Sequence, residues 1–234
     1  VSAVAAQPAV TGPTLFQNVR IFDGTGKTLS ASSNVLVRDN RIERVSGTPI
    51  AIDGLAGAIV IDGGGRTLMP GLIDMHWHTM LVRPRFSELL TVDVGYLNVL
   101  GATEATATLM RGFTTVRDVG GPAFGLKRAI DEGALPGPRI YPSGAMITVT
   151  SGHGDFRQPF EVPRIPGKLS RMELLGGSMV ADSPDEVRMR AREQLLLGAT
   201  QIKLTAGGGV ASPHSPLDAT TLTEEELRAA VEAA

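Results

Sequence analysis

The chain has 234 residues, a formal net charge of -2 and no cysteine. Hydrophobic and charged fractions of 42% and 20% are typical of a globular protein and argue against a disordered or fibrous one. The small net charge without a Lys/Arg cluster argues against nucleic-acid binding, and no apolar run reaches the length of a membrane span. Disulfides and thiolate metal sites are excluded, so any metal must use histidine, carboxylate or a less usual ligand.

The first residues, VSAVAAQPAV, are small and lack an initiator Met. The A-x-A pattern Ala3-Val4-Ala5 is typical of the end of a secretory signal, where cleavage follows. We therefore expect a flexible tail over residues 1–13 of a periplasmic or secreted protein. A flexible Ala-rich tail on a cytoplasmic protein is the alternative.

Residues 14–67 are predicted to form a small β-domain. TLFQNVRIF and NVLVRDNRIERVS alternate apolar and polar residues, with Asp39-Asn40 as a hairpin turn, and AIVIDGGGRTL ends the section on a glycine cluster. Residue types that carry chemistry do not cluster there, so we expect a scaffold or a lid.

Strand and helix patterns alternate through residues 68–234, which predicts βα units on a parallel sheet. Predicted strands cover GLIDMHWH, 113–121, 139–147 and 200–209. Helices are predicted around 98–111, 124–132, 183–197 and at the C-terminus, where Thr223 and Glu226 form a capping box. Four such units are about half of a (β/α)8 barrel, in which chemistry lies at the C-terminal strand ends. Asp118, Lys203 and the two histidines of GLIDMHWH fall near those ends.

His76 and His78 are two residues apart on a predicted strand, so both imidazoles point to one face, as two ligands of one metal ion would. Trp77 and Met75 are expected to point the other way, toward the packed helices. A chance His-x-His or a pair of core histidines is the alternative.

Lys203 lies in QIKLT, between apolar residues of a predicted strand. A buried ammonium must be paired, neutral or chemically modified, unless the lysine extends to solvent from an edge strand. A Schiff-base or general-base role is also open. Asp118, before Gly120-Gly121, is read as a partner that orients a metal ligand or as a turn-capping carboxylate.

The long segment 150–181 is predicted to be an irregular functional loop. Within it, His153 is flanked by two glycines, which would let it approach a substrate, and a terminal carboxylate is the expected contact. A mobile surface histidine is the alternative. Loop arginines 157, 164 and 171 are expected to be mostly solvated, and His214 is read as a surface-loop residue.

The sequence resembles the amidohydrolase superfamily. MPGLIDMHWH is similar to the Pro-Gly-x-Ile-Asp-x-His-x-His signature of the first barrel strand. FTTVRDVGG, SGHGDF, IKLTAGGGVASP and LTEEELRAAVEAA resemble the imidazolonepropionase-related branch. That branch includes zinc-dependent dipeptidases and carboxypeptidases, prolidase-like enzymes and ochratoxin-hydrolysing amidohydrolases. The implied fold is a (β/α)8 barrel with a small N-terminal β-sandwich.

The resemblance implies a dinuclear site in which His76 and His78 bind one metal and a carbamylated Lys203 bridges two. A bridging hydroxide would then attack an amide or peptide carbonyl of a dipeptide-like or N-acyl amino acid substrate. Zinc is implied, although Mn, Fe or Co suit the same nitrogen and oxygen ligands. Hydrolysis of cyclic amides is the nearest alternative.

The family pattern requires two further histidines and an aspartate from later barrel strands, and the chain ends at Ala234 before them. We therefore expect a longer native enzyme, with the missing C-terminal half of the barrel supplied elsewhere, and by resemblance a homo-oligomer. A non-catalytic half is the remaining alternative.

Overall fold

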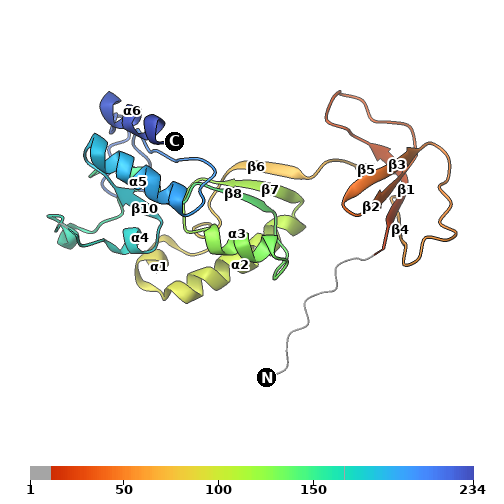
Figure 1. Ribbon diagram of the computed structural model, residues 1–234, viewed down its shortest axis with the longest axis horizontal. Helices are drawn as coiled ribbons and strands as arrows, with labels where there is room; N and C mark the ends of the chain where they lie inside the picture. The colour runs from red at the N-terminus through yellow and green to blue at the C-terminus, as the bar shows by residue number, and fades with distance from the viewer. Residues whose placement is uncertain (1–11, 166) are drawn as a thin grey trace, which may run out of the picture. The chain divides into compact units, whose positions relative to one another are not determined.

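The computed structural model describes residues 12–165 and 167–234 and divides into two compact units, one ending at Gly71 and the other beginning at Leu72 (Figure 1). The division lies a few residues after the boundary expected between residues 67 and 68. The Ala3-Val4-Ala5 pattern and most of the predicted tail lie outside the described residues. Among the helices that are described, none is long and apolar enough to cross a membrane.

The first unit is a five-stranded sheet in the order β3-β2-β1-β4, with β5 beside β1. Its strands are β1 (Thr14–Ile21), β2 (Ser33–Arg38), β3 (Arg41–Ser46), β4 (Ile59–Asp62) and β5 (Thr67–Leu68). Asp39 and Asn40 form the predicted turn between antiparallel β2 and β3, and both have positive φ, which these residue types tolerate. Strand β1 pairs with β4 before an irregularity near Asn18 and with β5 after it.

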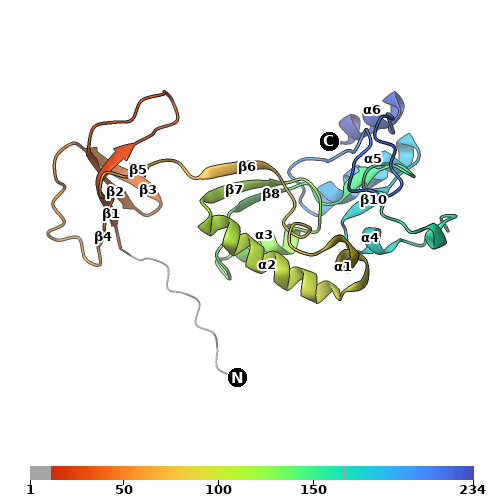
Figure 2. The same ribbon diagram turned by 180° about the vertical axis from the view of Figure 1, so that it is seen from behind.

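The second unit begins with the parallel sheet β6-β7-β8, which confirms the predicted parallel pairing of these strands. Their bounds are β6 (Leu72–Trp77), β7 (Phe113–Asp118) and β8 (Arg139–Pro142), and the intervening helices are α1 (Phe86–Thr91), α2 (Val94–Met110) and α3 (Phe124–Asp131). Helices α2 and α3 cover the same face of this sheet (Figures 1 and 2). Trp77 packs in that layer with Val116 and Ile140, as predicted, whereas Met75 is exposed.

Two predicted strands differ from the structure. The expected strand 139–147 is divided into β8 and β9 (Met146–Thr148), with Gly144 at a φ of 71° between them. The expected strand 200–209 is reduced to isolated bridges, Leu204 with Ile147 and Gly207 with Thr220. The segment changes partner within three residues, from β9 at Leu204 to Thr220 at Gly207, so neither bridge extends into a ladder.

The segment 150–181 is more ordered than the predicted irregular loop. It contains a 3-10 turn (Pro159–Glu161), helix α4 (Arg171–Leu174) and strand β10 (Ser178–Val180), which pairs in parallel with β9. Helices α5 (Pro184–Leu196) and α6 (Glu224–Ala233) follow. Ser183 caps α5, and the capping box of Thr223 and Glu226 begins α6 as predicted.

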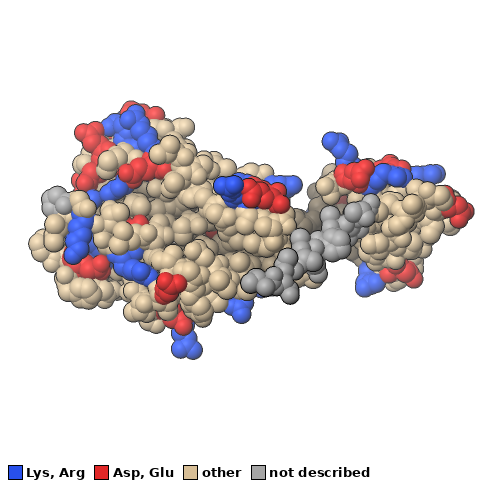
Figure 3. Space-filling model, turned by 60° about the horizontal axis from the view of Figure 1, so that its bottom comes forward, with Lys and Arg blue, Asp and Glu red and all other residues tan. Residues whose placement is uncertain are grey.

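Acidic and basic side chains are interspersed on the face that Figure 3 shows. Helix α3 illustrates this mixture with two ion pairs, Lys127 with Asp131 and Arg128 with Glu132, each spanning one helical turn. The described residues on this face therefore do not form a large patch of one charge.

Candidate functional site

Strand β6 carries the histidine pair at its C-terminal end. The ring centroids of His76 and His78 are 5.4 Å apart, with the rings nearly edge to face. This separation leaves room for one ion between a nitrogen of each ring. Burial, followed by the positive charge of Lys203, lowers the pKa of His76, and burial lowers the pKa of His78. Both imidazoles are thus neutral at physiological pH, the state in which histidine binds a metal.

A contact with a backbone carbonyl orients the ring of His78. Its Nδ1 lies 3.2 Å from the carbonyl oxygen of Gly120, on the loop that follows β7. A side chain at position 120 would not fit, because a Cβ there would lie 2.7 Å from Met146 Cγ and 3.1 Å from His78 Nδ1. Glycine is therefore required for the loop to approach the imidazole.

Asp118, the last residue of β7, anchors both sides of this contact. It is fully buried and accepts hydrogen bonds from Thr79 N (2.8 Å), Thr79 Oγ1 (2.5 Å) and Gly120 N (3.1 Å). Burial raises its pKa to about 6 against the opposing effect of these donors, so the carboxylate is ionised at neutral pH. Asp118 thus reaches His78 through the neighbouring residues Thr79 and Gly120, and whether His78 is a metal ligand stays a prediction.

Lys203 lies where the 200–206 segment meets β9, and its backbone oxygen accepts a hydrogen bond from Ile147 N (2.9 Å). Burial, followed by the positive charge of Arg117, lowers the pKa of its amine. The charge of Lys203 in turn contributes to the lowered pKa of His76, His78 and His153. The structure therefore brings the four predicted residues of the site into one electrostatic neighbourhood.

His153 approaches the site from the loop after β9. Its Nδ1 lies 3.0 Å from Ser212 Oγ, and the same hydroxyl oxygen accepts a hydrogen bond from Gly154 N (2.8 Å). A Cβ on Gly209 would overlap the His153 ring at 2.1 Å. Gly209 thus allows close packing against this histidine, and burial lowers the pKa of His153, which keeps the ring neutral.

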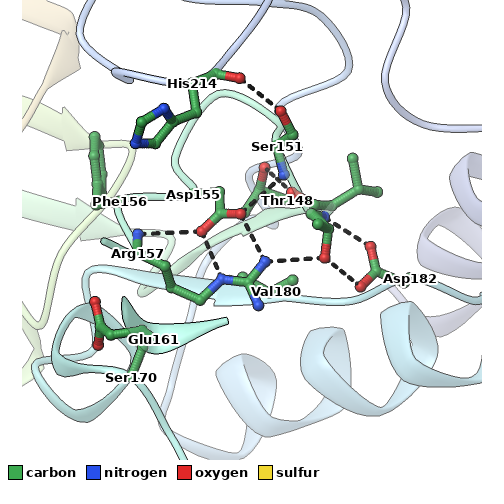
Figure 4. Close-up of polar contacts among 12 residues, drawn as sticks. Thr148, Ser151, Asp155, Phe156, Arg157, Glu161, Ser170, Val180, Asp182 and His214 are labelled. Atoms are coloured by element: carbon green, nitrogen blue, oxygen red, sulfur yellow. Dashed lines mark hydrogen bonds and ion pairs between the residues drawn. The ribbon is translucent and has the colours of Figure 1, made fainter. Parts of the chain in front are cut away.

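A buried ion pair holds the His153 loop in place, and sequence reasoning missed it. Arg157 donates from Nε to Asp155 Oδ1 (2.8 Å) and from Nη2 to Asp155 Oδ2 (2.7 Å), as Figure 4 shows. The expectation of a solvated loop arginine is wrong here, because both side chains are less than a tenth exposed. Arg157 also donates to Thr150 Oγ1, and Ser151 N donates to Asp155.

The other loop residues named from the sequence, Arg164, Arg171 and His214, contact other parts of the chain. Arg164 pairs with Glu186 at 3.1 Å, and Arg171 donates to the carbonyl of Val92. His214 is exposed, and its carbonyl accepts a hydrogen bond from Ser151 Oγ at 2.6 Å (Figure 4).

The donors present fit part of a metal site. Among the described residues, no three His, Cys, Asp or Glu side chains gather closely enough to hold an ion. Two neighbouring neutral imidazoles and a lysine of lowered pKa nevertheless form a ligand set if the lysine is converted to an oxygen donor. The described chain can thus supply part of such a centre, and further ligands are needed to complete it.

A pocket of about 380 Å³ opens beside these residues, with His78 and His153 among its lining side chains. This volume is within the usual range of small-molecule sites.

Comparison with known proteins places this geometry in a family. The model of the amidohydrolase family matches residues 67–234. The chain belongs to the amidohydrolase family. It is 33% identical over 178 residues to the ochratoxinase of Aspergillus niger, an alignment that covers 71% of the chain and 36% of that protein.

Solved amidohydrolase structures have the same fold. A prolidase complexed with N-methylphosphonate-L-proline has 36% identity and a TM-score of 0.81, with 94% of the chain and 53% of that protein covered. A Xaa-Pro dipeptidase with methionine in its active site has 29% identity and a TM-score of 0.77 over the same shares. The family expected from the sequence motifs is confirmed, and the chain spans about half the length of these structures.

Proposed function

We propose that the protein to which this chain belongs is a metal-dependent amidohydrolase that cleaves an amide or peptide bond in dipeptide-like or N-acyl amino acid substrates. The observation that carries the proposal is that His78 and His153 line one small-molecule pocket, with the ring of His76 5.4 Å from that of His78 and with Lys203 near enough for its charge to lower the pKa of all three histidines. Similarity to an ochratoxinase, a prolidase and a Xaa-Pro dipeptidase supports this substrate class.

In this proposal, His76, His78 and Lys203 hold part of a centre for two divalent ions, with zinc as the first candidate. Such ions polarise a carbonyl and lower the pKa of bound water. The chain's own residues prepare the site: the neutral imidazoles offer lone pairs, and Asp118 binds both Thr79, which follows His78, and Gly120, whose carbonyl contacts the His78 ring. This indirect support keeps the ring oriented.

Lys203 is the proposed bridging residue after carbamylation. Only a neutral amine reacts with CO2: the nitrogen forms a bond to carbon and loses a proton, and the product is an anionic carbamate. Burial and the charge of Arg117 favour the neutral amine, and the same Arg117 charge then favours the anion. The modification would replace a half-buried cation with an oxygen ligand.

His153 is the proposed substrate contact. Because Nδ1 faces Ser212, the Nε2 edge is left for a ligand, and the ring lines the pocket together with His78. In the tautomer in which the Ser212 hydroxyl donates to Nδ1, Nε2 carries the proton and offers a hydrogen bond to the carboxylate or carbonyl of a bound amide.

A substrate panel tests the proposal. The full-length protein, supplied with zinc, is assayed on dipeptides, N-acyl amino acids and lactams, before and after chelation. We expect hydrolysis of the open-chain amides that chelation abolishes and added metal restores. Preferential opening of lactams would support the cyclic-amide alternative instead, and turnover that survives complete metal removal would contradict the proposal.

A non-catalytic role for the described chain by itself is the second candidate. It is favoured by the lack of a third His or acidic ligand among the described residues. Hydrolysis of a dipeptide by the isolated 234-residue chain would exclude it.

We also propose a fold, a location and an oligomeric state for the whole protein. The parallel order β6-β7-β8 followed by β9 supports a (β/α)8 barrel completed by further chain, and the change of partner along β1 supports a small β-sandwich. We also propose export to the periplasm or medium and a homo-oligomer. Analytical ultracentrifugation of the full-length protein tests the oligomer.

A further inference from the structure

The pocket beside His78 and His153 is apolar except for these two histidines. Its other side chains come from the segment after β6, helix α1, strand β9, the 150–158 loop and Ala211; they include Leu81, Val82, Phe86, Met146 and Phe156. Among the described residues, its lining includes no carboxylate or cation. Such a surface favours an uncharged, apolar group and disfavours a charged one, which would lose hydration without gaining a partner.

Two aromatic rings form one side of this pocket. The centroids of Phe86 and Phe156 are 5.1 Å apart and the rings are tilted by 59°, within the range of a favourable aromatic pair. Phe156 is only 6% exposed and belongs to the core cluster that includes Leu89 and Met146. Phe86, by contrast, is 37% exposed, so part of its ring remains open to a ligand.

The buried ion pair fixes this aromatic wall. Asp155 and Arg157 are the immediate neighbours of Phe156, and their three hydrogen bonds to each other, one of them from the backbone N of Arg157, hold the backbone on both sides of the ring (Figure 4). A wall that is ordered before binding does not have to be ordered by the ligand, which reduces the entropic cost of recognition. The loop therefore places two binding elements, the imidazole of His153 and the ring of Phe156, from one fixed backbone segment.

We propose that the Phe86–Phe156 pocket is the specificity pocket of this amidohydrolase and selects substrates with a bulky apolar side chain next to the scissile amide. The inference rests on the proposed amide hydrolysis and adds the substrate side chain to it. A leucine or phenylalanine side chain fills the apolar pocket while His78 and His153, at the same pocket, lie near the amide. Small or charged side chains gain little from this surface.

The test uses the full-length, metal-loaded protein and two series of dipeptides, in which Ala, Leu, Phe or Asp occupies either the amino-terminal or the carboxy-terminal position. In one series we expect kcat/KM to rise roughly 10- to 100-fold from Ala to Leu or Phe. Phe86→Ala should reduce this preference to about threefold or less, and Val82→Trp, which fills the pocket, should reverse it in favour of Ala. Phe160→Ala is the matched control, because Phe160 is 85% exposed outside the pocket.

A binding measurement separates this inference from the proposed function. Isothermal titration calorimetry compares N-acetyl-phenylalaninamide with N-acetyl-alaninamide, without turnover as the readout. Tighter binding of the phenylalanine compound that is lost in Phe86→Ala supports the pocket even if no amide is hydrolysed, in which case the proposed function fails alone. Equal binding of the two compounds, a flat preference in both dipeptide series, or an undiminished preference in Phe86→Ala would overturn the inference.

Discussion

The two sides of the candidate site are held by different means. His76 and His78 sit at the end of a strand, where backbone pairing with β7 and the buried carboxylate of Asp118 fix them. His153 sits on a loop that is held mainly by side-chain contacts, namely the buried Asp155–Arg157 ion pair, the Ser212 hydroxyl and hydrogen bonds to Asp182 and His214. The strand side is thus secured by many small interactions, whereas the loop side depends on a few strong ones. Single substitutions should therefore reposition the loop side far more easily.

The largest loss of activity is expected when Lys203 is substituted. Lys203→Ala in the full-length protein should lower kcat/KM by about 10,000-fold or more, since metal centres supply several kcal/mol of transition-state stabilisation. Steady-state kinetics on the preferred dipeptide measures it. Lys127→Ala is the control, because Lys127 forms only an exposed pair with Asp131 on α3. Near-normal turnover by Lys203→Ala would rule out the bridging role.

The loop side can be broken by removing its anion. Asp155→Ala leaves the buried Arg157 charge without its partner and should cost about 3–5 kcal/mol of unfolding free energy. Urea denaturation followed by circular dichroism measures the loss. Glu132→Ala, which removes an exposed partner of Arg128, should cost no more than about 1 kcal/mol. Equal losses in the two variants would mean that the buried pair is not what holds the loop.

Acid should weaken the same pair. Burial pushes the pKa of Asp155 upward, but hydrogen bonds from Arg157 and Ser151 outweigh it, so the folded-state pKa lies below the ordinary value. The pair therefore stabilises the fold above the unfolded-state pKa of about 3.9, and this contribution is lost as pH falls through the lower folded-state value. The difference in unfolding free energy between wild type and Asp155→Ala should be full at pH 7 and should shrink below about pH 4. A difference in unfolding free energy that grows as the pH falls would contradict this prediction.

A smaller change should displace His153 alone. Gly209→Ala places a methyl group on the His153 ring, and such overpacking typically costs about 1–3 kcal/mol. We expect a higher KM together with lower stability, measured by kinetics and thermal unfolding. Gly207→Ala is the matched control, because the nearest atom to its Cβ would be 3.9 Å away. Indistinguishable KM values in the two variants would speak against a substrate contact by His153.

The strand side of the site, with His76 and His78, could be predicted from the sequence. The loop side, with His153, could be predicted only in part. The spacing of His76 and His78, the hairpin turn and the capping box are local patterns whose geometry follows from a few consecutive residues. Asp155 and Arg157 are also close in sequence, but opposite charges two residues apart are common in solvated loops, so their burial had no local signal. Phe86 and Phe156 meet only because α1 and the loop pack together, which no single segment encodes.

Contacts between distant segments also explain why two predicted strands differ from the structure. Apolar alternation over 139–147 and 200–209 predicts extended chain. The length of a ladder depends on its neighbours, and β9 offers the 200–209 segment only one bridge at Leu204. Strand β10 was hidden in the predicted loop because three residues are too few for a periodic pattern.

Metal stoichiometry tests the central claim most directly. Inductively coupled plasma mass spectrometry of the purified full-length protein, with Lys203→Ala measured beside it, counts the bound ions. The account predicts two divalent ions per wild-type chain and a loss of at least one in Lys203→Ala. Metal-free wild-type protein that still hydrolyses its substrate, or an unchanged count of two ions in Lys203→Ala, would contradict it.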